Sequence, residues 1–203
     1  MTNPGARTTR RRKLAELAGQ FGGIFTAAAA RELGLSSGAL AHHTRTGAVE
    51  HVGRGVYRVA GFPPSPNDRL VALAAALGGG AVASHETALK LYGVSDVAPS
   101  RLHFTLPRWR RYVGTRQPDV QIHTTSRPVP AYEIVQHEGF RATSLPRSIV
   151  DSARTHTDPE QIIMATREGI RRGLLSEQRL RQASKNAPKR VRDLIESAIS
   201  EAP

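Results

Sequence analysis

Ser84, His85 and Glu86 are consecutive, and together they supply the hydroxyl, imidazole and carboxylate of a hydrolytic triad. A triad works only when its three side chains converge in space. Adjacent residues on a helix point in different directions, so three consecutive positions do not converge. We therefore interpret Ser84 as a helix cap and Glu86 as an acidic residue favoured by the helix dipole. His85 has a second interpretation, as a partly buried residue held by hydrogen bonds.

Other catalytic signatures are also missing from the sequence. A restriction-type nuclease needs Glu-x-Lys or Gln-x-Lys beside its metal, but the residues two positions before the four lysines are Arg or Ala. The histidines include no His-Glu-x-x-His pair, and His42 and His43 are adjacent on a predicted helix, so they do not share a face for zinc. Glycines 78–80 lack the Lys-Ser/Thr of a phosphate loop. Asp151 is interpreted as the partner of a nearby arginine or as a backbone cap. We predict no enzyme, no catalytic residue, no metal and no cofactor.

Positive charge is the strongest signal of the whole chain. Its 203 residues include 29 Lys and Arg against 17 Asp and Glu, a net charge of +12. Residues 1–60 hold nine basic and three acidic residues, a net charge of +6, so the basic excess is densest at the N-terminus. Released counterions drive such proteins onto nucleic acid; Arg-rich codon usage is the alternative explanation. With no cysteine, no signal peptide and no apolar run of membrane-spanning length, the chain is predicted to be cytoplasmic and to have no membrane partner.

Three helices and a hairpin are predicted within residues 1–60. The first helix has an apolar face at i, i+3, i+4 and i+7, formed by Leu14, Leu17, Ala18 and Phe21. Two further helices, over 26–34 and 36–47, each begin at a Thr or Ser cap and end at a glycine. The turn between them is as short as that of a helix-turn-helix. Residues 49–59 contain two valine-rich runs joined by Gly-Arg-Gly, which predicts a β-hairpin. Residues 1–60 are therefore predicted to form a winged helix-turn-helix DNA-binding domain.

The third helix is predicted to be the recognition helix of this domain. Leu40 lies on the side that faces the other helices, and Ser37 and Arg45 lie toward the opposite side. Arginine can read guanine with two hydrogen bonds, and a helix N-terminus suits a phosphate. The predicted DNA-binding residues are Arg10, Arg11, Arg12 and Lys13 of a basic arm, Ser36, Ser37, His42 and Arg45 of the recognition helix, and Arg54 at the hairpin tip. The alternative is a winged fold that contacts protein, with these residues merely solvated.

A second domain is predicted after a linker at 61–66, where prolines exclude regular structure. Residues 67–203 combine a small sheet with C-terminal helices, so the whole chain is assigned to the α+β class. Helices are expected near 67–77, from Ser84 to Gly93, after Pro146 and Pro159, and at the C-terminus; strands are expected over 101–107 and 120–126, and as a hairpin turning at Glu138-Gly139.

One aromatic residue of this second domain is surrounded by arginines. The candidate partner-binding residues are Arg108, Trp109, Arg110 and Arg111. Arginine and tryptophan dominate the hot spots of interfaces, which favours contact with an acidic protein surface or with nucleic acid. Tryptophan packed on the core, with solvated arginines beside it, is the equally weighted alternative.

The order of several segments resembles one known family. FGGIFTAAAARELGLSSGALAHHTRTGAVEHVGRGVYRVAG resembles the N-terminal winged helix of AbiEi-type antitoxins. GAVASHETALKLYGV, RLHFTLPRWRR, GFRATSLPRSIVDSA and REGIRRGLLS resemble the C-terminal antitoxin domain of that family. The resemblance implies a type IV toxin–antitoxin pair. Its antitoxin represses its own operon by binding operator DNA and counteracts an AbiEii-like nucleotidyltransferase toxin. A stand-alone winged-helix transcriptional regulator without a toxin partner is the alternative.

Overall fold

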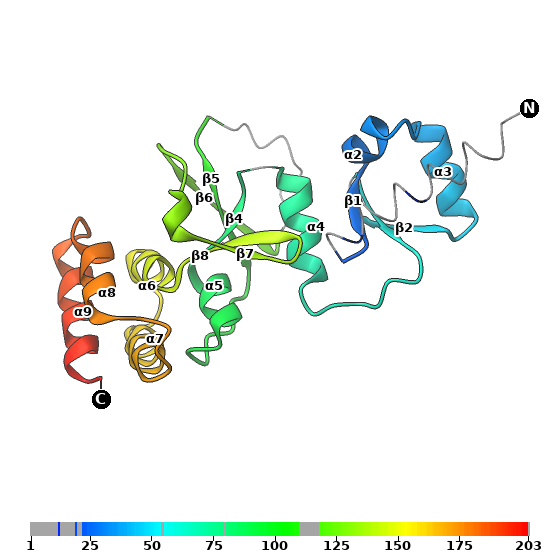
Figure 1. The fold of residues 1–203 in the computed structure, drawn as a ribbon. Coiled ribbons are helices and arrows are strands. Elements are labelled where there is room, and N and C mark those ends of the chain that lie inside the picture. The colour runs from blue at the N-terminus through cyan, green and yellow to red at the C-terminus, as the bar shows by residue number, and fades with distance from the viewer. Residues whose placement is uncertain are drawn as a thin grey trace, which may run out of the picture. The chain divides into compact units, whose positions relative to one another are not determined.

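The chain folds into two compact units. The computed structural model describes residues 12, 19, 22–53, 55–78, 80–109 and 118–202. The first unit runs to residue 79 and includes the turn at 137–140, and the second unit holds the remaining residues. Figure 1 shows helices and strands in both units. The α+β class predicted from the sequence is confirmed.

The first unit is a winged helix-turn-helix. Its elements are β1 (Ile24–Thr26), α2 (Ala27–Glu32), α3 (Ser37–Arg45), β2 (Val49–Gly53), β3 (Val56–Val59) and α4 (Asp68–Leu77). Three strands form an antiparallel sheet in the order β1-β3-β2. The hydroxyl of Thr26 accepts a hydrogen bond from the Ala29 N–H at 3.1 Å, and that of Ser36 accepts one from the Ala39 N–H at 3.2 Å. Both predicted caps are confirmed. The helix predicted at 14–21 lies almost entirely outside the described residues.

A small apolar core holds this unit together. It is formed by Phe25, Ala30, Leu35, Leu40 and Val49. Phe25 belongs to β1, a strand that was missed because it has only three residues and no alternating pattern. Its ring stacks on that of Tyr57 in β3 at 5.7 Å. The core therefore fixes α2 and α3 against the hairpin, and this arrangement positions the predicted recognition helix.

The fourth helix belongs to the first unit rather than to the second. Arg58 in β3 pairs with Asp68 in the first turn of α4, with 2.6 Å between Nη2 and Oδ2. Asp68 also accepts a hydrogen bond from the Ser65 N–H at 3.0 Å. The predicted linker at 61–66 is thus bonded to the helix that follows it, and the contacts divide the chain after α4. The linker prediction rested on prolines alone, which exclude helix and strand but do not exclude attachment.

The second unit begins with a five-stranded sheet in the order β6-β5-β4-β8-β7. Its strands are β4 (Val82–Ala83), β5 (Leu102–Pro107), β6 (Val120–Thr125), β7 (Ile134–His137) and β8 (Phe140–Thr143), and a short 3-10 helix, η1 (Ala131–Glu133), precedes β7. β4 is antiparallel to β5 and parallel to β8, while β5 and β6 are parallel. The hairpin turn at 138–139 lies where the sequence predicts it. The two-residue strand β4 was not predicted.

In the part of the chain that the structure describes, five helices accompany this sheet: α5 (His85–Tyr92), α6 (Leu145–Arg154), α7 (Pro159–Arg171), α8 (Glu177–Ser184) and α9 (Lys189–Ser200). Figure 1 shows α6 to α9 gathered in one group beyond the sheet. Ile162 of α7 and Val191 and Ile195 of α9 are fully buried in one large core. Within the described residues, no helix is both long and apolar enough to cross a membrane.

Candidate nucleic-acid interface

The turn between α2 and α3 fixes the start of α3, the predicted recognition helix. Gly34 has a φ of +80°, a left-handed conformation that glycine adopts without the penalty of a Cβ. Leu35 follows and is 6% exposed in the apolar core, so it anchors the turn. The Ser36 hydroxyl then starts α3. This sequence of a left-handed glycine, a buried anchor and a cap sets the direction in which α3 leaves the turn.

Helix α3 presents the predicted residues on one exposed face. Leu40 is buried at 3% exposure and faces the core, whereas Ser37, His42 and Arg45 are exposed. At about 1.5 Å of rise per residue, Ser37 and Arg45 lie about 12 Å apart along the axis, a length that fits several base pairs of a major groove. Ser36 is also exposed, but its hydroxyl already serves the cap. The structure thus brings together four of the nine predicted DNA-binding residues.

The wing is formed by β2 and β3. Their register shifts by one residue between His51 and Gly53, which is a β-bulge and increases the local twist. The ring of His51 meets that of Tyr57 edge to face at 5.2 Å, and His51 is exposed on the wing. His51 was not predicted as a site residue, and strand alternation does not reveal it, because alternation would place His51 on the same face as buried Val49. Arg54 lies outside the described residues.

The basic arm is only partly described. Arg12 is exposed. Arg10, Arg11 and Lys13 lie outside the described residues, so their contribution to DNA binding stays a prediction.

The sequence of this winged helix matches a known family. Residues 12–60 match the AbiEi antitoxins, described as transcriptional regulators. The match covers the predicted recognition helix and the wing. Among solved structures, the chain is similar to the RV2827C protein from Mycobacterium tuberculosis, with 16% identity and a TM-score of 0.58 over 97% of this chain and 78% of that chain. At this identity the similarity shows a shared fold. No curated protein matches the sequence.

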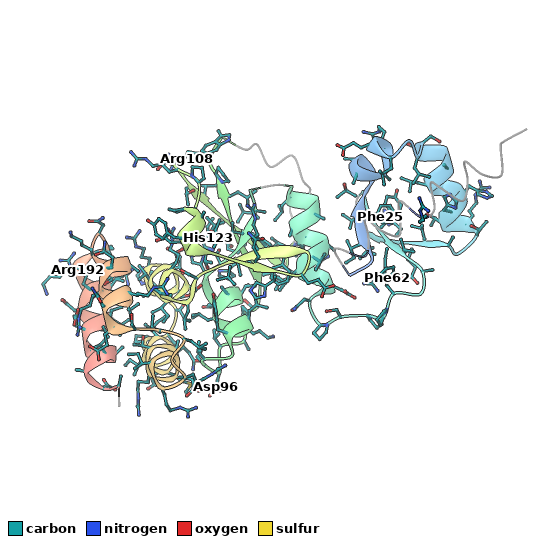
Figure 2. The ribbon with its side chains drawn as sticks, viewed as in Figure 1. Phe25, Phe62, Asp96, Arg108, His123 and Arg192 are labelled. Carbon is teal, nitrogen blue, oxygen red and sulfur yellow. The ribbon has the colours of Figure 1, made fainter. Side chains whose placement is uncertain are left out.

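Beyond the AbiEi-like region, two of the four candidate partner-binding residues are described. The backbone N–H of Arg108 donates a hydrogen bond to the carbonyl of Thr125 at 2.7 Å, which prolongs the pairing of β5 with β6. Trp109 follows and its exposed fraction is 62%, so it is not packed on the core. Figure 2 shows Arg108 at the outer end of β5. Arg110 and Arg111 lie outside the described residues.

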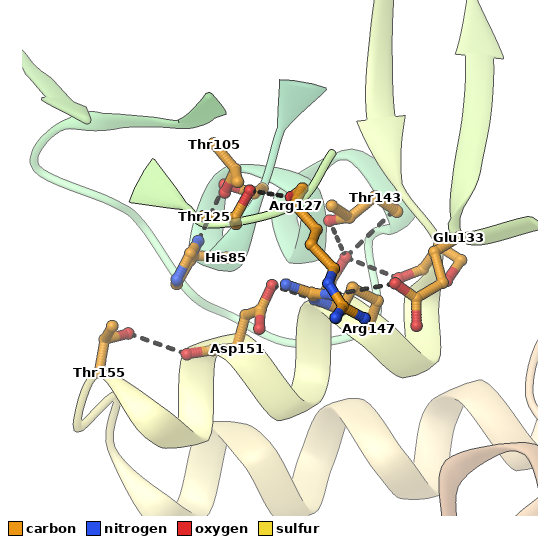
Figure 3. Close-up of polar contacts among 12 residues, drawn as sticks. His85, Thr105, Thr125, Arg127, Glu133, Thr143, Arg147, Asp151 and Thr155 are labelled. Carbon is orange, nitrogen blue, oxygen red and sulfur yellow. Dashed lines mark hydrogen bonds and ion pairs between the residues drawn. The ribbon is translucent and has the colours of Figure 1, made fainter. Parts of the chain in front are cut away.

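The predicted role of Asp151 is confirmed, because its carboxylate pairs with an arginine. Arg147 Nε lies 2.6 Å from Asp151 Oδ2, and Arg147 Nη1 lies 2.9 Å from Glu133 Oε2 (Figure 3). Burial works against the charge of Arg147, but its two carboxylate partners outweigh this effect and raise its pKa. This triad joins α6 to the segment before β7.

Ser84 corrects the interpretation made from the sequence. It occupies the N-cap position of α5, but its side chain makes no capping hydrogen bond. Its hydroxyl instead lies 2.8 Å from His85 Nδ1 and accepts a hydrogen bond from the Thr105 hydroxyl at 2.8 Å. His85 is 5% exposed, as its second interpretation expected. The side chain of Ser84 therefore orients a histidine.

Sequence reasoning missed a cluster of three histidines in the second unit, formed by His85, His103 and His123. Burial, reinforced by His123, His103 and Arg147, lowers the pKa of His85 to about 2. Burial and His103 lower the pKa of His123 to about 4. Burial also lowers the pKa of His103, although Glu86 acts in the opposite direction. All three imidazoles are therefore neutral at pH 7.

Proposed function

We propose that this protein is an antitoxin that represses its own operon and counteracts a nucleotidyltransferase-like toxin. The observation that carries the proposal is the exposed face of α3, with Ser37, His42 and Arg45, inside the region that matches AbiEi transcriptional regulators. The chain binds double-stranded operator DNA through this face. It acts by binding rather than by catalysis, and it does so where the operon lies, in the cytoplasm.

The proposed DNA contacts are of two kinds: contacts to phosphates, which position the protein, and contacts to bases, which recognise the operator sequence. The N-terminal end of α3 approaches a phosphate, because first-turn N–H groups and the helix dipole favour an anion there. Arg45, two turns further along the same face, reads guanine in the major groove. Arg54 and the basic arm, both predicted from the sequence, add phosphate or minor-groove contacts. The net charge of +12 supplies the salt-dependent part of the affinity.

The proposed division of labour follows the two compact units. The first unit binds DNA, and the second acts on the toxin. Arg108 and Trp109 offer an exposed aromatic and cationic surface for that task.

The test uses the full chain and a fragment of its own promoter. Arg45→Ala is expected to weaken binding in a mobility-shift assay, while neutralisation of the toxin encoded beside it continues. Arg179→Ala, which removes the same charge from an exposed position on α8, is the matched control. Loss of toxin neutralisation in the Arg45 variant, or equal loss of DNA binding in both variants, would contradict the proposal.

A stand-alone regulator is the second candidate function. It is favoured by the extent of the family match, which covers residues 12–60, within the first unit. The two candidates differ in one genetic observation. An antitoxin requires a co-transcribed reading frame for a nucleotidyltransferase-like protein, and co-expression must relieve the toxicity of that protein.

A further inference from the structure

Three histidines from three different elements converge in the second unit. One nitrogen of each ring can be chosen so that all three atoms lie within 4.8 Å of one another. His85 begins α5, His103 lies in β5 and His123 lies in β6. They are separated by 18 and 20 residues in the sequence, so only folding brings them together. Figure 2 shows His123 on the sheet of this unit.

The strand register places two of these side chains on one face. In the parallel pairing of β5 with β6, Gln121 lies beside His103, and His123 lies beside Thr105. Because side chains alternate along a strand, His103, Thr105 and His123 share a face of the sheet. The residues between them, Phe104 and Ile122, point to the opposite face. This alternation directs both imidazoles toward the start of α5.

The third histidine is held in place by a dedicated arrangement. His85 has a φ of +54°, which is unusual for a residue with a side chain. Its Nδ1 lies 2.8 Å from the Ser84 hydroxyl, which in turn accepts a hydrogen bond from Thr105 (Figure 3). The other ring nitrogen, Nε2, stays available for the cluster. Metal-binding histidines are commonly oriented in this way, through a hydrogen bond to the ring nitrogen that does not bind the ion.

The spacing of the ring nitrogens suits a shared ion. His103 Nδ1 and His123 Nε2 share a hydrogen bond at 3.1 Å, which an ion would replace. Two imidazole nitrogens on one tetrahedral zinc ion, each at about 2.0–2.1 Å, are separated by about 3.3 Å. The rings of His85 and His123 are nearly parallel, 3.6 Å apart, and the lone pairs of parallel rings do not converge. One ring must therefore turn when an ion binds, and His123, which is only half-buried, has the freedom to do so.

Acidic and basic side chains both lie around the cluster. Arg147 acts on His85, and Arg101 and Glu86 act on His103. Arg147 is itself paired with Asp151 and Glu133. Arg154 acts on Asp151 as well, so the carboxylates and guanidinium groups named here balance, and the affinity for a cation comes from the three imidazoles.

We propose that His85, His103 and His123 bind one transition-metal dication of the zinc type. Imidazole ligands suit zinc, copper, iron and nickel, whereas magnesium and calcium prefer oxygen. Three protein ligands leave a coordination position for water or for an oxygen of a further ligand. The half-buried His103 and His123 leave the site open to solvent on their side. This binding site is independent of the winged helix and does not rest on the proposed DNA-binding function.

The experiment measures metal binding by the full chain without a histidine tag. Isothermal titration with ZnCl2 is expected to give one ion per chain with a dissociation constant in the micromolar range or tighter. Titration with CoCl2 is expected to give the intense visible absorption of a four-coordinate cobalt site. His103→Gln and His123→Gln, at half-buried positions, are each expected to weaken zinc binding at least tenfold and to abolish that absorption.

His51→Gln, at an exposed histidine of the first unit, is the matched control and is expected to bind zinc as the unchanged protein does. Far-UV circular dichroism verifies that each variant is folded. The proposal is overturned if the unchanged protein shows no saturable one-to-one binding, a result that depends on no variant. It is also overturned if folded His103 and His123 variants bind zinc as tightly as the control, or if the control loses affinity equally.

Discussion

Arg58 in β3 forms an ion pair with Asp68 in the first turn of α4, and both side chains are about 15% exposed. The pair ties the last strand of the wing to the helix that follows the proline-rich segment. Because Asp68 also accepts a hydrogen bond from the Ser65 N–H, one carboxylate fixes both the segment and the helix. The first unit therefore extends through α4.

This ion pair leads to a prediction about the boundary of the first unit. A fragment of residues 1–79 is expected to unfold cooperatively, and a fragment of residues 1–66 is expected to be markedly less stable because it lacks α4. In the longer fragment, Asp68→Ala is expected to lower the free energy of unfolding by about 1–3 kcal/mol, since it leaves Arg58 and the Ser65 N–H without their acceptor. Urea unfolding followed by circular dichroism measures both effects. Equal stability of the two fragments would place the boundary back at 61–66.

A second prediction concerns how Arg45 contributes to DNA binding. If Arg45 contacts a base, Arg45→Ala is expected to weaken the binding free energy for the operator by about 1–3 kcal/mol. The difference in affinity between operator and random DNA is then expected to shrink. Fluorescence anisotropy at several salt concentrations measures affinity and salt slope together. An equal loss of affinity for both DNAs, with the slope of affinity against salt concentration reduced by about one, would instead show that Arg45 contacts a phosphate.

Two substitutions of Ser36 distinguish its role as the cap of α3 from its proposed role in DNA binding. Its hydroxyl accepts the Ala39 N–H, so Ser36→Ala is expected to lower the free energy of unfolding by about 1 kcal/mol. Ser36→Asp keeps a good cap and adds a negative charge at the proposed phosphate position. We expect this variant to be as stable as the unchanged protein but to bind DNA more weakly, as measured by thermal unfolding and anisotropy. Unchanged DNA affinity in the Asp variant would show that no phosphate binds at this end of the helix.

Gly23 occupies a position that excludes a side chain. Its φ is +85°, and a Cβ built there would lie 2.5 Å from Cγ of Phe62. Gly23→Ala is expected to destabilise the first unit by more than about 1 kcal/mol, because it combines a strained backbone with a displaced ring. Gly22→Ala, at a φ of +59° with open space around its Cβ, separates the two causes. Similar losses in both variants would show that the Phe62 contact contributes nothing.

The neutral state of His85 predicts a pH dependence of stability. Its folded pKa is about 2 against 6.5 for the ordinary residue, so between these values the unfolded chain binds one more proton than the folded chain. The free energy of unfolding is therefore expected to fall as the pH drops below 6.5, by about 2 kcal/mol at pH 5 from this residue alone. His103, His123 and Arg147 face the same ring.

The measurement for this prediction is urea unfolding in the presence of a chelator, from pH 7.5 to pH 5. His85→Asn is the comparison, because asparagine tolerates a positive φ and does not titrate in this range. The variant is expected to show a shallower pH slope than the unchanged protein. Equal slopes would mean that His85 contributes nothing to the acid sensitivity.

Local patterns in the sequence were sufficient to predict most of the helices and the exposed face of α3. Thr26 and Ser36 cap the predicted helices because the cap bond spans only three residues. The outward direction of Ser37, His42 and Arg45 follows from the period of a helix once Leu40 is placed in the core. The match of residues 12–60 to AbiEi antitoxins agrees with that interpretation.

Long-range contacts decided what local patterns could not. β1 and β4 are two or three residues long, and such strands exist only because a partner strand supplies their hydrogen bonds. Ser84 occupies the position where a helix cap is expected. Its hydroxyl instead forms hydrogen bonds with His85 and with Thr105, which is 21 residues away in the sequence. The histidine cluster depends on the register of β5 with β6, which no local pattern specifies.

The sequence by itself determined the winged helix, the basic character and the exposed face of α3, because helix period, capping and charge are properties of neighbouring residues. Only the tertiary structure assigned α4 to the first unit and gathered His85, His103 and His123. Those relationships join side chains 10 to 38 residues apart in the chain, and they exist only when packing and strand register bring distant segments together.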